Sequence, residues 1–275
     1  MGAHYRKHID IDDVGAIEHT NNRLMNELML ATNIDEENKA YKRYSSRIAS
    51  ITAIKNGRLN KTLRFNRNNT NKRLDTNLTN MASDLRPFII GYQSMAYLDL
   101  SNSQPVLFNK ILQAYRENAS IIVLKEIDRY LHITTAGRWY EELIRVFDVK
   151  YGPDENLNFE EARNVCKNVW MLLAYSQNNE LRNLKKVFAL EYPFISSLIK
   201  DIKKTNYNQL AISLQLIESD VFIDKICKQL VAEDIIPYTM HDGLLVPKDA
   251  KDRTKDVMMY HLKEIIGACP KIKVN

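Results

Sequence analysis

Residues 235–247 have the sequence IIPYTMHDGLLVP, which predicts two short β-strands, Ile235–Met240 and Leu244–Pro247, joined by a tight turn at His241–Gly243. A second apolar segment, Met95–Leu100 (MAYLDL), predicts another strand, and Asp99 lies near its end. Asp99 and the aspartate of the turn both have apolar neighbours. A carboxylate in apolar surroundings is costly to desolvate unless a cation lies nearby. The pattern indicates either a cation site or, for each acid taken alone, an ordinary turn or capping residue.

A helix is predicted over residues 160–175 (EEARNVCKNVWMLLAY), between these strands in the sequence. Four of its side chains fall at successive i, i+4 positions and therefore share one face: Arg163, Lys167, Met171 and Tyr175. Two cations, an apolar side chain and an aromatic ring in this order suit a nucleoside triphosphate. An ordinary amphipathic helix with a charged end is the alternative interpretation.

The two carboxylates and the cationic helix together meet the requirements of phosphoryl transfer with two divalent metal ions. In this chemistry carboxylates hold two hard cations roughly 3.5–4 Å apart, one activating the attacking hydroxyl and the other stabilising the leaving pyrophosphate. Arginine and lysine neutralise charge on the triphosphate. The sequence therefore favours a nucleotidyltransferase site that contains Asp99, Asp242 and the predicted helix.

The rest of the chain is predicted to be mostly helical. Residues 55–73 contain seven basic side chains and no acid, interleaved with asparagines. This run predicts a loop, which either is simply solvated or contacts phosphates and sugars. The other predicted elements are helices over Asp12–Ala31, Glu36–Ile54, Pro105–Tyr115 and Asp252–Ile266, a largely helical stretch up to residue 230, and a short strand over Lys271–Val274. The pattern is α+β with helices dominating.

The composition limits the class of protein. With 275 residues, 45% hydrophobic and 27% charged, and a net charge of +5, the chain is expected to fold around a core and not to be disordered. Cys166, Cys227 and Cys269 are widely spaced and odd in number, which predicts reduced thiols. No apolar segment is long enough for a membrane helix or a signal peptide. We therefore expect a soluble intracellular protein with no membrane partner.

The segment around Asp99, the helix over residues 160–175 and the turn at His241–Gly243 follow one another in the chain. In this order they resemble the palm-and-fingers core of the family A DNA polymerases and of their relatives, the single-subunit RNA polymerases of phages and mitochondria. Asp99–Gln104 (DLSNSQ) resembles motif A of that family, Arg163–Tyr175 resembles motif B, and His241–Asp242 resembles motif C. Gly243 departs from the pattern, because the DNA enzymes usually carry Glu there and the RNA enzymes Ser.

Three further segments extend the resemblance to about residues 70–275. Residues 73–86 (RLDTNLTNMASDLR) resemble a family segment that contacts template and primer. Residues 187–199 (VFALEYPFISSLI) and 214–226 (LQLIESDVFIDKI) resemble two others that lie between motifs B and C. The spacing between motifs B and C is shorter than in either relative, which predicts small fingers.

The resemblance implies a right-hand polymerase fold, with a palm made of a small antiparallel sheet backed by helices. Residues 1–70 would form a helical thumb-like region with the basic Asn-rich loop. The palm would comprise residues 71–118, with motif A, and residues 201–275, with motif C. Reduced fingers, residues 119–200, would carry the motif B helix.

The resemblance also implies roles for individual residues. Asp99 and Asp242 would be catalytic and bind two Mg²⁺ ions, for which Mn²⁺ would substitute. The incoming nucleotide would contact Arg163, Lys167, Met171, Tyr175 and Gln104. Primer and template would contact His241, Arg73, Asn80, Arg86 and Gln215.

The implied function is template-directed addition of nucleotides to a primer 3′-hydroxyl, with accessory proteins as further partners. Gln104 favours a DNA polymerase, because it is about as large as the Glu with which the DNA enzymes block the ribose 2′-hydroxyl. Its amide is also able to hydrogen-bond that hydroxyl. The motif B residues instead favour a DNA-directed RNA polymerase. An inactive nucleic-acid-binding palm, and a template-independent or protein-primed transferase, are the remaining alternatives.

Overall fold

The structure, a computed structural model, describes residues 1–153 and 155–275. Its centre is an antiparallel sheet with the strand order β4-β5-β3-β6. The strands are β3 (Met95–Leu100), β4 (Tyr238–Met240), β5 (Gly243–Pro247) and β6 (Ile272–Val274). All were predicted from the sequence, although β4 begins at Tyr238 and not at Ile235. Pro237 precedes it and has no N–H group for the ladder.

The central strand β3 separates two environments because successive side chains point to opposite faces of a sheet. Ala96, Leu98 and Leu100 are buried in the larger of two hydrophobic clusters, together with residues of the covering helices. Tyr97 packs against the smaller cluster, and Asp99 points to the same face as Tyr97. One strand therefore joins the helical core to the face that carries the acids.

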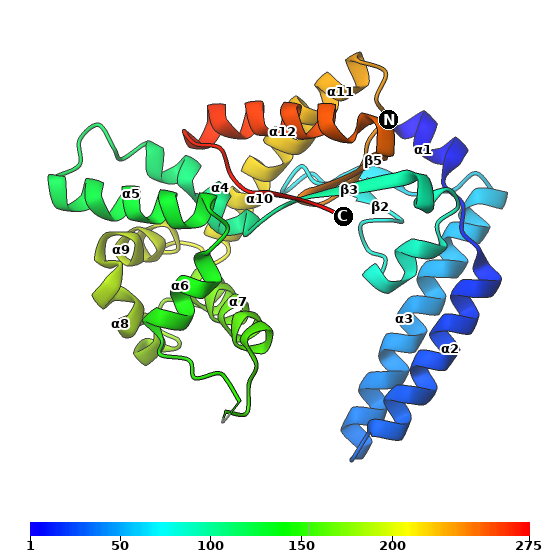
Figure 1. The fold of residues 1–275 in the computed structure, drawn as a ribbon, viewed down its shortest axis with the longest axis horizontal. Helices are drawn as coiled ribbons and strands as arrows, with labels where there is room; N and C mark the ends of the chain where they lie inside the picture. Colours follow the sequence, from blue (N-terminus) through cyan, green and yellow to red (C-terminus); the bar gives the residue numbers. More distant parts are fainter. Residues whose placement is uncertain (154) are drawn as a thin grey trace.

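Helices cover one side of the sheet. They are α4 (Ser103–Gln113), α10 (Gln209–Ser219), which continues through a π-helical segment (Asp220–Cys227) into α11 (Lys228–Ala232), and α12 (Lys251–Ile266). Figure 1 shows α12 and α11 on this side, while a helical hairpin and a helical lobe project from the opposite side, with a wide gap between them.

The hairpin consists of α2 (Asp13–Leu30) and α3 (Ile34–Leu59). Both helices begin at side-chain caps, since Asp12 accepts a hydrogen bond from Gly15 N–H at 3.1 Å and Asn33 accepts one from Glu36 N–H at 3.0 Å. Arg47 binds Asp84 at 3.1 Å. Since Asp84 belongs to the 3₁₀ helix η1 (Ser83–Phe88), this ion pair ties the hairpin to the sheet region.

The prediction of a loop over residues 55–73 is wrong in part. α3 continues to Leu59, and β1 (Phe65–Arg67) pairs antiparallel with β2 (Leu74–Thr76). Several cations of this run are held by acids from elsewhere: Lys55 by Asp13 at 2.8 Å, Arg64 by Asp75 at 3.3 Å, Arg67 by Asp224, and Arg73 by Glu218 at 2.6 Å. Helix, a strand pair and ion pairs therefore replace much of the predicted loop.

The helical lobe contains α5 (Ile121–Thr135), α6 (Trp139–Val146), α7 (Phe159–Tyr175), α8 (Arg182–Glu191) and α9 (Pro193–Ile202). Its centre is an aromatic cluster in which the rings of Trp139 and Trp170 meet edge to face at 5.3 Å. Aromatic rings of this size supply most of the apolar area that a small lobe buries. The predicted boundaries of thumb, palm and fingers remain a prediction.

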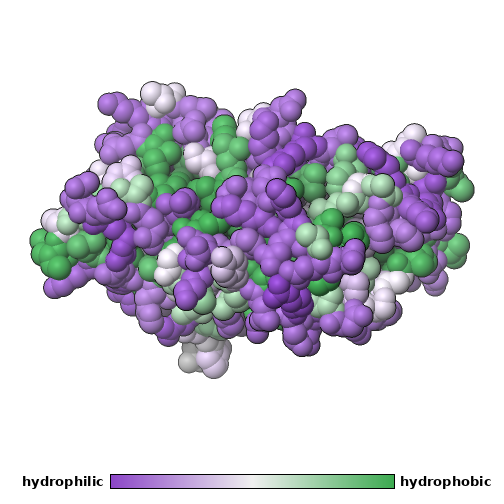
Figure 2. Space-filling view, turned by 90° about the horizontal axis from the view of Figure 1, so that it is seen from above, coloured by the Kyte–Doolittle hydropathy of each residue, from purple (hydrophilic) through white to green (hydrophobic). Residues whose placement is uncertain are grey.

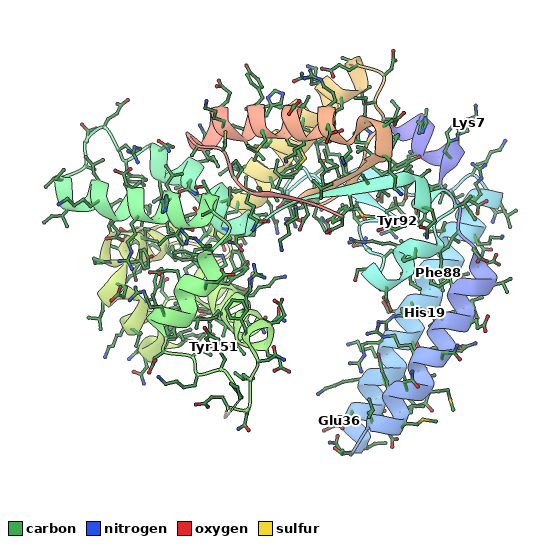
Figure 3. The ribbon with its side chains drawn as sticks, viewed as in Figure 1. Lys7, His19, Glu36, Phe88, Tyr92 and Tyr151 are labelled. Carbon is green, nitrogen blue, oxygen red and sulfur yellow. The ribbon has the colours of Figure 1, made fainter. Side chains whose placement is uncertain are left out.

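The surface is largely hydrophilic. Figure 2 shows hydrophilic side chains over most of the upper face, with hydrophobic residues in scattered patches. Among the described residues, every helix is too short or too polar to span a bilayer. Figure 3 places Tyr151 in the helical lobe, on the other side of the gap from His19 and Phe88.

Candidate active site

A cavity of about 710 Å³ collects residues from β3, α4, α7, α10, β6 and the β4–β5 turn. Ten of the twelve residues predicted for the site line it: Arg73, Asp99, Gln104, Arg163, Lys167, Met171, Tyr175, Gln215, His241 and Asp242. These positions span 170 residues of the chain, so only the fold brings them together.

The two aspartates lie side by side at the base of this cavity. Asp99 on β3 is the cross-strand neighbour of Gly243, and the N–H of Leu100 donates to the carbonyl of Asp242 at 3.3 Å. The turn between β4 and β5 positions Asp242, with His241 in the left-handed region at φ 59°. The sheet register therefore sets the relative positions of the two carboxylates.

Electrostatics make this pair a suitable place for a cation. Burial, together with the negative charge of Asp242, raises the pKa of Asp99 to about 6. A hard divalent cation would relieve this repulsion, and carboxylate oxygens are the ligands that Mg²⁺ prefers. Within the part of the chain that is described, no group of three or more His, Cys, Asp or Glu side chains is placed to hold a metal ion. A metal ion at this place would have the two carboxylates as its acidic ligands from the protein.

Helix α7 presents its cationic stripe to the cavity because its opposite face is buried. Asn158 and Glu161 form a capping box at its start, and Cys166 and Trp170 are buried in the core. Arg163 Nε contacts Glu141 Oε1 at 2.9 Å, and its guanidinium lies 5.3 Å from the ring centroid of Tyr140. For Lys167, which is exposed, the described residues supply no acidic partner. Lys167 is therefore the more available of the two cations.

A chain of hydrogen bonds closes one side of the cavity. The hydroxyl of Tyr175 donates to Gln104 Oε1 at 2.9 Å, and Gln104 Nε2 donates to Glu218 Oε2 at 3.0 Å. Glu218 is 2% exposed and also accepts from Arg73 at 2.6 Å. Burial raises the pKa of Glu218 to about 7, although Arg73 opposes this shift. The side chains of Tyr175 and Gln104 are thereby fixed.

Sequence reasoning missed three residues at this site. Glu218 is an acid inside an apolar helical stretch, which is the same signal that identified the aspartates. Asn102 has a left-handed backbone at φ 52° and lines the cavity, and among the described residues neither of its buried side-chain amide atoms has a hydrogen-bond partner. Tyr97 is separated from Asp99 by one residue on β3, and no sequence pattern distinguishes it from a core tyrosine.

The structure does not bring two of the predicted contacts into the cavity. Asn80 is exposed, and its Nδ2 donates to Asp75 Oδ1 at 2.8 Å. Arg86 is half-buried, with its guanidinium 5.1 Å from the ring centroid of Tyr97. Because the cavity lining does not include them, any contact of these residues with primer or template would lie outside it.

Comparisons with known proteins address the fold. No family model matches the chain, and no curated protein matches it in sequence. The structure is similar to the POL domain of Pol1 from M. smegmatis, which was solved in complex with DNA primer-template and dNTP, with a TM-score of 0.54 and 13% sequence identity. The similarity covers 87% of this chain and 52% of that one, so the chain spans about half the length of this structure. The polymerase-like α+β fold predicted from the motifs is thereby confirmed.

Proposed function

We propose that the chain is a template-directed nucleotidyltransferase that extends a primer 3′-hydroxyl by two-metal-ion phosphoryl transfer. The single observation that carries this proposal is the cavity in which Asp99 and Asp242 face the Arg163–Tyr175 stripe of α7. Sequence-distant carboxylates and cations in one cavity are what triphosphate chemistry requires. The fold similarity to a polymerase domain supports the same conclusion.

Each part of the cavity has a role in this proposal. Asp99 and Asp242 would hold two Mg²⁺ ions, which would supply activation of the primer hydroxyl and charge stabilisation of the leaving pyrophosphate. Lys167 and Arg163 bind the triphosphate of the incoming nucleotide. Met171 and the ring of Tyr175 contact its base and sugar, and His241 places the primer terminus. Arg73 and Gln215 lie where the template strand would pass.

Primer extension tests the proposal directly. The protein is incubated with a recessed primer-template, Mg²⁺ or Mn²⁺, and labelled dNTPs or NTPs. Template-dependent incorporation is the expected result. Incorporation that does not depend on the template would identify a template-independent transferase, and no incorporation under any of these conditions would identify a nucleic-acid-binding scaffold instead.

A preference for dNTPs is the finer part of the proposal. Gln104 uses its amide oxygen to accept from Tyr175 and its amide nitrogen to donate to Glu218. Because both ends of the Gln104 amide are already hydrogen-bonded, the side chain blocks a ribose 2′-hydroxyl sterically and does not form a new hydrogen bond with it. Gln104 and Tyr175 therefore act together as a steric barrier, which favours a DNA polymerase.

Gln104→Gly is expected to raise the NTP/dNTP ratio of kcat/KM by about tenfold or more, because it removes the barrier. Single-nucleotide incorporation with dNTP and NTP pairs gives the ratio. Gln113→Gly, in the same helix but outside the cavity, is the matched control. An unchanged ratio would show that Gln104 does not select the sugar.

Lys167→Gln is expected to raise the KM for the incoming nucleotide by about 10- to 100-fold, because a charge-assisted contact to phosphate is lost. Steady-state primer extension at saturating primer-template measures this effect. Lys110→Gln replaces an exposed lysine of α4 outside the cavity and should leave the KM unchanged. Equal KM values for Lys167→Gln and Lys110→Gln would show that the triphosphate does not bind at Lys167.

A further inference from the structure

Position 243 directly follows Asp242, and a side chain there would collide with the ring of Tyr97 as it is placed. A β-carbon on Gly243 would lie 2.4 Å from the hydroxyl oxygen of Tyr97 and 2.6 Å from its Cζ atom. Contacts this short do not occur, and the obstacle is an aromatic ring. The backbone of Gly243 does not lie in the left-handed region, so the ring of Tyr97 and not the backbone conformation disfavours a side chain there.

Tyr97 occupies this space because of the register between β3 and β5. Asp99 is paired with Gly243 and Tyr97 with Leu245, so the tyrosine ring extends along the strand toward the glycine. Its hydroxyl oxygen lies 3.5 Å from Asp99 Oδ1. The ring thus lies beside the carboxylate that the proposed function assigns to metal binding.

Arg86 packs over the ring of Tyr97. Its guanidinium lies 5.1 Å from the ring centroid, which is a cation–π distance. Arg86 Nε is buried without a hydrogen-bond partner among the described residues, and the guanidinium lies over the tyrosine ring. Arg86 and Tyr97 therefore lie in succession beside the Asp99 carboxylate.

We infer that Tyr97 is a positioning residue that replaces the side chain missing at position 243. Its ring fills the volume above Gly243 and restricts the Asp99 carboxylate to the orientation that faces Asp242. Arg86 keeps the ring in place. This inference rests on the proposed function, since it assigns to Asp99 the role of a metal ligand. It also explains the departure from the motif, because a large residue at 97 and a glycine at 243 are complementary in volume.

Metal affinity and stability, measured separately, test the inference. Mn²⁺ binding to the protein without nucleic acid is measured by titration calorimetry or electron paramagnetic resonance, and thermal unfolding is followed in parallel. Tyr97→Ala is expected to weaken Mn²⁺ binding by about tenfold or more, because Asp99 loses its lateral contact. Tyr97→Phe keeps the ring and should weaken it only by about two- to fivefold. Tyr92→Ala, which removes a half-buried tyrosine away from the acids, should bind Mn²⁺ like the wild type.

A second test combines substitutions at positions 97 and 243. Gly243→Ala should lower the unfolding temperature, because its β-carbon collides with the ring. Adding Tyr97→Ala to it should remove the collision, so that the double variant recovers the unfolding temperature of Tyr97→Ala alone but not the affinity for Mn²⁺. Recovery of both would mean that the ring only fills space, and wild-type Mn²⁺ affinity in Tyr97→Ala would overturn the inference. If the wild type binds Mn²⁺ but extends no primer, the proposed function fails while these comparisons remain decisive for Tyr97.

Discussion

Asp242→Asn is expected to reduce primer extension by about a thousandfold or more, while the affinity for a primer-template duplex changes by about twofold at most. The substitution keeps the shape of the side chain but removes a charged metal ligand, and metal ions contribute several kcal/mol to transition-state stabilisation. Duplex affinity depends mainly on contacts of cationic side chains with the phosphate backbone, to which an acidic side chain does not contribute. Single-turnover extension and fluorescence anisotropy measure the two quantities.

Two matched variants complete this experiment. Asp99→Asn should behave like Asp242→Asn, because the two carboxylates share the same site. Asp249→Asn changes an exposed aspartate of the turn after β5 and should extend primers like the wild type. Wild-type activity in Asp242→Asn would refute the assignment of the site.

Arg73→Ala is expected to lower the free energy of unfolding by about 3 kcal/mol at pH 9 and by much less at pH 6. Arg73 is the cation that pairs with Glu218, which is 2% exposed, and a buried charge without its partner is strongly destabilising. The loss of unfolding free energy in Arg73→Ala is limited because Glu218 takes up a proton. The carboxylate becomes neutral when the pKa of Glu218 lies above the pH of the solution.

The direction of the pH dependence follows from linkage. The folded-state pKa of Glu218 is raised from 4.5 to about 7, and removal of Arg73 raises it further. Above pH 7 the wild type releases this proton and the variant retains it, so the destabilisation grows by up to about 1.4 kcal/mol per pH unit. Below pH 7 both proteins hold the proton, and only the lost packing of Arg73 remains.

Urea unfolding between pH 6 and pH 9 checks this prediction. The control combines Arg73→Ala with Glu218→Gln, which leaves no carboxylate to titrate and should show a destabilisation independent of pH. A loss of stability in Arg73→Ala that is the same at pH 6 and pH 9 would show that the charge of Glu218 is not responsible.

Much of the fold could be predicted because its signals are local. The strand Met95–Leu100 and the turn at His241–Gly243 follow from apolar alternation and turn chemistry within a few residues. The stripe on α7 follows from i, i+4 spacing alone. The run over residues 55–73 could not be predicted correctly, because its order depends on distant partners such as Asp224 and Glu218.

The sequence by itself identified Asp99, Asp242 and the α7 stripe as candidate site residues that follow one motif order. Only the tertiary structure decided their surroundings: the bonds from Glu218 to Arg73 and Gln104, and the ring of Tyr97 over Gly243. The physical reason is that helix and strand periodicity act over a few residues. Side-chain volume and charge pairing, in contrast, act between residues that are more than 100 positions apart in this chain and meet only when the sheet register is formed.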